Sequence, residues 1–207
     1  MIYIRVDTEE LENAIRDLGI PKGKLNNILK SAINRTARQV KDWLPKETED
    51  RYHIRRMRNV RKNLIMKGAR VSNPVAHITS TGHANDLYDF NVTSRRYNPS
   101  NRPPMGHKAN VLRSNSPVSL MLKPNASGDK YRAFVVKYES KHIAIAQRVP
   151  GTRMRSNPNK ESIKNLYSIS TPAMLGYEKG VGAKVLPKTE ELLVSEVAKG
   201  IARYLKL

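Results

Sequence analysis

Cysteine is absent from this 207-residue sequence, which also has only two Phe and one Trp. Without cysteine, the chain can form neither a disulfide framework nor a thiolate metal site. The apolar fraction of 39% is slightly below the globular norm, yet a chain of this length can form a core without disulfides or metals. The composition is typical of a modest core, or of a core whose apolar surface is completed by neighbouring subunits.

Long hydrophobic runs are missing as well. No apolar stretch approaches the roughly 20 residues that a membrane-spanning helix needs. The opening sequence, Met-Ile-Tyr-Ile-Arg-Val-Asp, has neither the basic start nor the apolar stretch of a signal peptide. We therefore expect a protein without membrane contact, which is made and acts in a cytoplasm or in a particle assembled there.

Positive charge is what the sequence has in excess. It holds 38 Lys and Arg residues against 18 Asp and Glu residues, a formal net charge of +20 at pH 7. Residues 1–50 carry equal numbers of both signs, and most of the excess lies in residues 51–150. Clustered cations gain free energy by releasing counterions from phosphates, so this distribution predicts a polyanion near the middle of the chain. The alternative is a basic surface that meets acidic protein partners.

Hydrophobic periodicity in the first quarter of the chain predicts one strand and two helices. Apolar side chains alternate over residues 2–6, as in a half-buried strand. A capping box then precedes a short helix over residues 7–19. Apolar residues at spacings of three and four predict a long amphipathic helix over residues 24–44. Pro45 is expected to kink or end this helix, and residues 46–52 could restart one.

The middle of the chain has the period of strands and then loses it. Residues 64–71 and 75–79, separated by Ser-Asn-Pro, predict a hairpin. Residues 83–117 contain several prolines among Asn, Ser and Arg. A loop of this length is unusual in a compact domain, so we expect an extended loop or arm that orders against partners.

The remaining residues predict further strands and a closing helix. We expect strands over residues 118–122, 133–138, 142–147 and 163–170, a second basic loop over 151–161, a short helix over 171–175 and a flexible Gly-rich segment over 176–184. The last helix is expected to begin near Pro187, since proline suits a first helical turn. Its expected apolar face consists of Leu193 or Val194, Val197, Ala198, Ile201 and Leu205.

Together these elements predict an α+β fold. We expect a mixed or antiparallel sheet packed by the helix of residues 24–44 and by the C-terminal helix. The whole chain, residues 1–207, is expected to form a single domain, with residues 83–117 as its extended loop or arm.

The candidate site is a run of cations between the long helix and the first hairpin. No acidic residue lies between Arg51 and Arg70. Phosphate binding requires such clustering and little else, and no motif for reading bases accompanies it. A solvated basic face would have the same pattern. The residues expected to face nucleic acid are Arg55, Arg56, Arg58, Arg61 and Lys62.

Residues for catalysis, cofactors or metals are not assembled by any recognisable motif. The five histidines are scattered, and none of their spacings matches a common zinc pattern. The Gly-rich stretch from Gly176 to Gly182 lacks the full phosphate-loop pattern, and no Gly-x-Ser-x-Gly elbow is present. We therefore expect no catalytic, cofactor-binding or metal-binding residue, and a protein that is not an enzyme.

A DNA-binding or DNA-processing protein is the alternative, and its most specific form is a metal-dependent nuclease. Glu139 and Lys141 end a predicted strand, where many nucleases place a magnesium ligand and a catalytic lysine. Asp129 or Asp86 would have to supply the second carboxylate. A turn between two strands explains the same Glu-Ser-Lys sequence without any chemistry.

Three stretches of the sequence resemble a known family of phage proteins. The first is Lys-Ser-Ala-Ile-Asn-Arg-Thr-Ala-Arg-Gln-Val-Lys-Asp-Trp-Leu at residues 30–44, followed by Arg-Tyr-His-Ile-Arg at 51–55. It is similar to the opening of the phage and prophage minor tail protein Z family. Gln-Arg-Val-Pro-Gly-Thr-Arg at 147–153 and Tyr-Ser-Ile-Ser-Thr-Pro-Ala-Met-Leu at 167–175 resemble the closing signatures of that family. The sequence departs from it in the segments 83–117 and 151–162.

The resemblance implies a structural tail completion or neck protein of tailed bacteriophages. Such proteins are small α+β components that finish the tail and join it to the DNA-filled head, and none is known as an enzyme. The implied partners are further copies of the chain in a ring of six, other phage neck and tail proteins, and phage DNA through non-specific contacts. The implied location is the tail or neck of the virion, which is assembled in the cytoplasm of the bacterial host.

Overall fold

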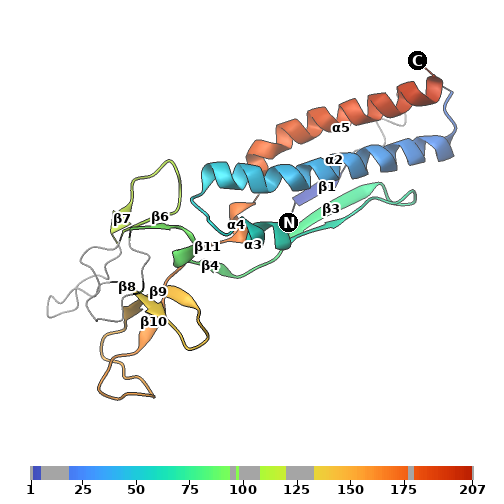
Figure 1. Cartoon of the computed structure of the whole chain (residues 1–207). Coiled ribbons are helices and arrows are strands. Elements are labelled where there is room, and N and C mark those ends of the chain that lie inside the picture. Colours follow the sequence, from blue (N-terminus) through green and yellow to red (C-terminus); the bar gives the residue numbers. More distant parts are fainter. Residues whose placement is uncertain are drawn as a thin grey trace. The chain divides into compact units, whose positions relative to one another are not determined.

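The computed structural model describes residues 2–5, 19–93, 97, 108–119, 133–176 and 180–206. Helices and antiparallel sheets are both present, which confirms the α+β fold (Figure 1). The chain divides into two compact units. Unit 1 comprises residues 1–48, 58–82 and 171–207, and unit 2 comprises residues 49–57 and 83–170. The single domain over residues 1–207 stays a prediction, because one domain can contain two such units.

Unit 1 combines two long helices with a small sheet. The sheet has the strand order β1-β3-β2, and both pairings are antiparallel. In chain order the elements are β1 (Ile2–Arg5), α2 (Lys22–Arg51), α3 (Met57–Lys62), β2 (Leu64–Lys67), β3 (Val75–Ser80), α4 (Thr171–Met174) and α5 (Gly182–Leu205), where the ends of α2 and α3 reach into unit 2. The predicted hairpin and the predicted short helix after residue 170 are confirmed. Residues 7–18 of the predicted short helix lie outside the described residues.

The long helix predicted over residues 24–44 is confirmed. The prediction that it could end at Pro45 is wrong. α2 continues through Pro45 to Arg51. A proline inside a helix costs roughly 3 kcal/mol, and packing offsets this cost because Leu44, Pro45 and Thr48 are all buried. The Thr48 hydroxyl also donates a hydrogen bond to the Leu44 carbonyl over 2.6 Å.

The start and the apolar face of the last helix differ from the prediction. α5 begins at Gly182, within the segment predicted to be flexible, so Pro187 lies in its second turn. Val185 and Thr189 are buried on either side of this proline, and the Thr189 hydroxyl donates to the Val185 carbonyl over 2.9 Å. Of the predicted apolar face, Val197 is buried, whereas Val194 is 69% exposed and Leu205 is 37% exposed.

The helices α2 and α5 lie side by side and antiparallel (Figure 1). Near one end of the pair, Glu47 on α2 forms ion pairs with Lys184 and Lys188 on α5. Near the other end, Gly200 on α5 approaches Ile28 on α2 so closely that a Cβ atom at Gly200 would come within 2.6 Å of the Ile28 Cγ2 atom. A side chain at this crossing would therefore force Ile28 or one of the two helices to shift.

Side chains also connect α2 to the hairpin of unit 1. The Ala69 backbone N–H donates to the Asn34 side-chain oxygen over 2.8 Å, and the Asn34 amide donates back to the Ala69 carbonyl over 3.1 Å. Both backbone groups of Ala69 thus obtain partners just after β2 ends, where the sheet supplies none.

Unit 2 contains three small antiparallel sheets around one apolar cluster. The strand orders are β10-β9-β8, β11-β4 and β5-β6-β7. The elements are β4 (Ala84–Asp86), η1 (Leu87–Asp89), β5 (Asn91–Val92), β6 (Lys108–Asn110), β7 (Val118–Ser119), β8 (Phe134–Lys137), β9 (Ile143–Arg148), β10 (Ile163–Asn165) and β11 (Tyr167–Ser170). The buried cluster consists of Leu87, Val92, Ala109, Ala133 and Ile145.

The strands predicted over residues 133–138 and 142–147 are confirmed, whereas the next predicted strand needs correction. The strand predicted over 163–170 is two strands, because the chain changes partner from β9 to β4 at Leu166. The Leu166 N–H donates to the Ile145 carbonyl, and its carbonyl accepts from Leu87.

The segment predicted as an extended loop, residues 83–117, is in part folded. It supplies β4, η1, β5 and β6, and it contributes Leu87, Val92 and Ala109 to the core of unit 2. Most of its remainder, residues 94–96 and 98–107, lies outside the described residues, as does the end of the strand predicted over 118–122.

Candidate nucleic-acid interface

Three of the five predicted DNA-facing residues share one exposed face of α3. Arg58, Arg61 and Lys62 are all exposed, whereas Val60 on the other side of the helix is completely buried. Positions three and four apart are neighbours on a helix, so these cations lie close together. None of the three has an ion-pair partner in the part of the chain that the structure describes.

Arg55 and Arg56 precede the helix and do not belong to its exposed face. α3 begins only at Met57, and the backbone N–H of Arg55 donates instead to the Asp89 carbonyl over 2.9 Å. The Arg56 guanidinium pairs with the Asp89 carboxylate at 3.1 Å. Both arginines are exposed and belong to unit 2, whereas Arg58, Arg61 and Lys62 belong to unit 1.

The Asp89 carboxyl group lies in a protected environment. Its side chain is only 8% exposed, and burial raises its pKa, although the positive charge of Arg56 opposes this shift. Arg56 therefore offers less free positive charge to a phosphate than Arg58, Arg61 or Lys62.

A second polar cluster in unit 2 was not predicted from the sequence. The His142 imidazole lies 3.3 Å from the Asp86 carboxylate and stacks on the Tyr138 ring, with the ring centroids 6.0 Å apart. The Tyr138 hydroxyl is hydrogen-bonded to the Asn165 side chain, and burial raises the pKa of Tyr138. These contacts connect β4 and β10 to the turn between β8 and β9, and no local spacing in the sequence indicates them.

The residues of the nuclease alternative lie in a hairpin turn. Glu139, Ser140 and Lys141 are exposed between β8 and β9, and Lys141 adopts a φ of 63°. The Lys141 N–H donates to the Tyr138 carbonyl, which closes the turn. Asp86 pairs with His142, and Asp129 lies outside the described residues. Among the residues that the structure describes, no three His, Asp or Glu side chains come close enough to hold a metal ion.

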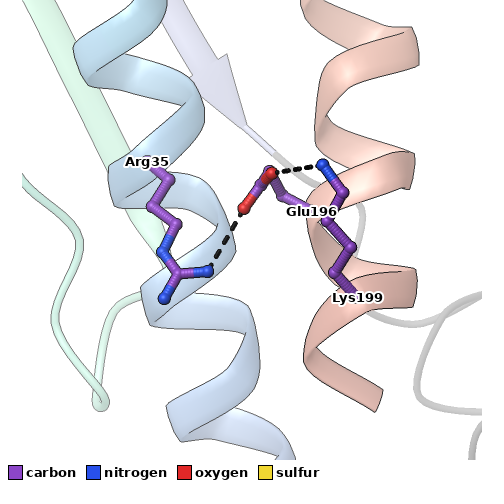
Figure 2. A network of polar contacts seen from close by, with 3 residues as sticks. All are labelled: Arg35, Glu196 and Lys199. Carbon is purple, nitrogen blue, oxygen red and sulfur yellow. Dashed lines mark hydrogen bonds and ion pairs between the residues drawn. The ribbon is translucent and has the colours of Figure 1, made fainter. Parts of the chain in front are cut away.

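A further polar site lies between α2 and α5 in unit 1. The Glu196 carboxylate accepts hydrogen bonds from Lys199 over 2.9 Å and from Arg35 over 3.3 Å (Figure 2). Its side chain is only 9% exposed, and these bonds, led by that from Lys199, lower the pKa of Glu196. Helical spacing places Glu196 on the side of α5 that carries Val185 and Thr189, which was the available signal for a buried carboxylate.

Beside this network runs an open groove between the two helices. The less exposed part of its lining contains Ile28, Ala32 and the Glu196 carboxylate, and the exposed part carries cations. The lining includes Lys24, Ile28, Ala32, Arg35, Gly200 and Arg203. Lys24 and Arg203 have no ion-pair partner within the described residues, so the groove is electropositive.

The chain was compared with protein-family models, curated proteins and solved structures, and none of them matches it. Membership of the minor tail protein Z family therefore stays a prediction from the sequence motifs. No helix in the described part of the chain has the length and apolar character needed to cross a membrane.

Proposed function

We propose that this protein is a structural tail completion or neck component of a tailed bacteriophage. In this role it finishes the tail, helps to join it to the DNA-filled head, and performs no catalytic reaction. The observation that carries the proposal is the Ala-Ile-Asn-Arg-Thr-Ala helix followed by Arg-Tyr-His-Ile, which resembles the minor tail protein Z family.

The roles of these motif residues are compatible with a resemblance in fold. Ala32, Ile33, Thr36 and Ala37 are all buried on α2, and Asn34 holds the end of β2 through both backbone groups of Ala69. Tyr52 and Ile54 are buried in unit 2, and Tyr52 pairs with Leu112. A motif made of core residues supports a shared architecture and assigns no catalytic role.

Loss of the protein tests this proposal most directly. A phage or prophage whose gene for this chain carries an early stop codon should release DNA-filled heads and separate tails, and plating efficiency should fall by orders of magnitude. Supplying the protein in trans should restore joined particles. Electron microscopy of gradient fractions would show both results. Normal infectious particles from the mutant would contradict the proposal.

The exposed cations of α3 favour one additional activity, which is non-specific contact with DNA. Arg58, Arg61 and Lys62 have the clustering that phosphate binding requires, and a neck protein lies beside the DNA that leaves the head. The DNA-processing alternative would instead require the turn residues Glu139 and Lys141. Cleavage of DNA by the purified protein with magnesium, lost in Glu139→Ala and Lys141→Ala, would favour that alternative.

A further inference from the structure

The exposed side of α5 carries a stripe of acidic and apolar side chains. Glu190, Glu191, Val194 and Ala198 follow one another at helical spacing and are all exposed, with Val194 at 69%. Within the described residues, neither glutamate has an ion-pair partner. In a chain whose net charge is +20, this stripe places two negative charges beside an exposed valine, so it is complementary to a surface that carries cations around apolar side chains.

The opposite side of the same helix borders the electropositive groove. At 3.6 residues per turn, Glu196, Gly200 and Arg203 point away from Val194 by roughly half a turn. The groove combines the apolar residues Ile28 and Ala32 with cations at exposed positions of its lining. The cations of the groove are thus opposite in charge to the glutamates of the stripe, and both surfaces contain apolar side chains.

We propose that the α5 stripe of one copy docks into the α2–α5 groove of the next copy. Glu190 and Glu191 would meet the unpaired cations Lys24 and Arg203, and Val194 would cover Ile28 and Ala32. The proposal rests on the proposed function, and it names the two surfaces through which the neck ring closes. A contact between different faces of identical subunits is heterologous, which is the kind that generates a ring.

The composition of the groove favours a protein segment over nucleic acid as its occupant. A phosphate backbone would leave Ile28 and Ala32 uncovered. An acidic segment with a small apolar side chain satisfies both parts of the groove. It would also reduce the repulsion between neighbouring subunits that each carry a charge of +20.

Charge reversal tests the pairing. Self-association of the purified chain is measured by sedimentation velocity over a range of concentrations. Glu190→Lys with Glu191→Lys, or Lys24→Glu with Arg203→Glu, should each weaken it at least about tenfold, because like charges then face each other. All four substitutions in one chain should restore association. The matched controls are Glu49→Lys with Asp50→Lys, and Lys22→Glu with Lys206→Glu, which change the net charge equally at other exposed positions.

The absence of cysteine allows a second, independent test. A chain with both Val194→Cys and Ser31→Cys should form a ladder of disulfide-linked oligomers on mild oxidation, because the two positions lie on surfaces that meet only between copies. A chain with Val194→Cys alone should stay uncrosslinked. Efficient formation of disulfide-linked dimers by that single variant would mean that the α5 stripes of two copies contact each other. This result would overturn the proposal.

The failures of the two proposals can be told apart. A wild-type chain that stays monomeric at every concentration overturns the docking proposal, whatever is found in the neck of the particle. Self-association that is unchanged by all of the charge reversals also overturns the docking proposal. It would remain compatible with a ring that closes through other contacts. Loss of DNA binding in Lys24→Glu with Arg203→Glu, with self-association intact, would assign the groove to nucleic acid instead.

Discussion

At the scale of single residues, two buried carboxyl groups show that partners and burial can shift a pKa in opposite directions. Glu196 accepts hydrogen bonds from two cations, and these lower its pKa despite its burial. Asp89 forms an ion pair with Arg56 at 3.1 Å, but here burial prevails and raises the pKa of Asp89. The ionised form is therefore favoured by folding at Glu196 and disfavoured at Asp89.

We expect Glu196→Gln and Asp89→Asn to change stability with opposite dependence on pH. The stabilisation by Glu196 is present above its ordinary pKa of 4.5 and is lost as the pH falls through the lower folded value. The contribution of Asp89 is most favourable below its ordinary pKa of 3.8 and is lost as the pH rises through the higher folded value. Urea unfolding between about pH 3 and pH 7 measures both differences. Parallel curves for the two variants would contradict the assigned directions.

At the scale of secondary-structure elements, single polar side chains hold neighbouring elements together. Asn34 lies in the middle of α2 and bonds both backbone groups of Ala69 after β2. Asn27 lies about two turns earlier on the same helix, but its amide donates to the carbonyl of Gly23 within α2. Two asparagines on one helix thus have different roles, one between elements and one within its own helix.

Asn34→Ala should therefore destabilise unit 1, whereas Asn27→Ala serves as the matched control. Removing Asn34 leaves the N–H and carbonyl of Ala69 without partners, which costs roughly 1–3 kcal/mol for groups shielded from water. Asn27→Ala should cost less than about 0.5 kcal/mol, as for other exposed helix positions. Chemical unfolding gives both values, and hydrogen exchange at Ala69 should accelerate only in Asn34→Ala. Equal effects of the two substitutions would argue against this role of Asn34.

The sequence was sufficient where local periodicity alone determines an element. The apolar spacing of residues 24–44 predicted α2, and alternation predicted the β2–β3 hairpin. Prolines were misleading, since Pro45 and Pro187 both lie inside helices. Burial of neighbouring residues offsets the free-energy cost of a proline in a helix. The break at Leu166 was missed for a related reason, because the residue is held by partners far away in the sequence.

The candidate site could be predicted only in part, for the same physical reason. Arg58, Arg61 and Lys62 share a face because helical spacing alone brings them together. The position of Arg56 depends on Asp89, and the groove depends on the pairing of Arg35 with Glu196, 161 positions later. Contacts across such distances are set by the tertiary fold, which one sequence without its structure does not provide.

At the scale of the whole molecule, the net charge of +20 must be balanced wherever many copies gather. Acidic surface on neighbouring copies can offset part of it, and phosphates can offset more. The free cations of α3 should then contribute more to the affinity for DNA than Arg56, which is paired with Asp89. This inequality distinguishes a phosphate-binding surface from a protein that is merely basic.

DNA binding by the purified protein should be weak, independent of sequence and steeply reduced by salt. Each phosphate contact contributes a slope of about 0.9 in a plot of log affinity against log salt concentration. Arg58→Gln with Lys62→Gln should therefore lower the slope by roughly two contacts, and Arg56→Gln should lower it less, because Asp89 already pairs with Arg56. Arg38→Gln with Lys46→Gln removes the same charge from exposed positions on α2 and is the matched control. Fluorescence anisotropy with labelled duplexes of two unrelated sequences measures all of these slopes. If the control pair lowered the slope as much as Arg58→Gln with Lys62→Gln, overall charge alone would explain binding and α3 would not be the DNA-facing surface.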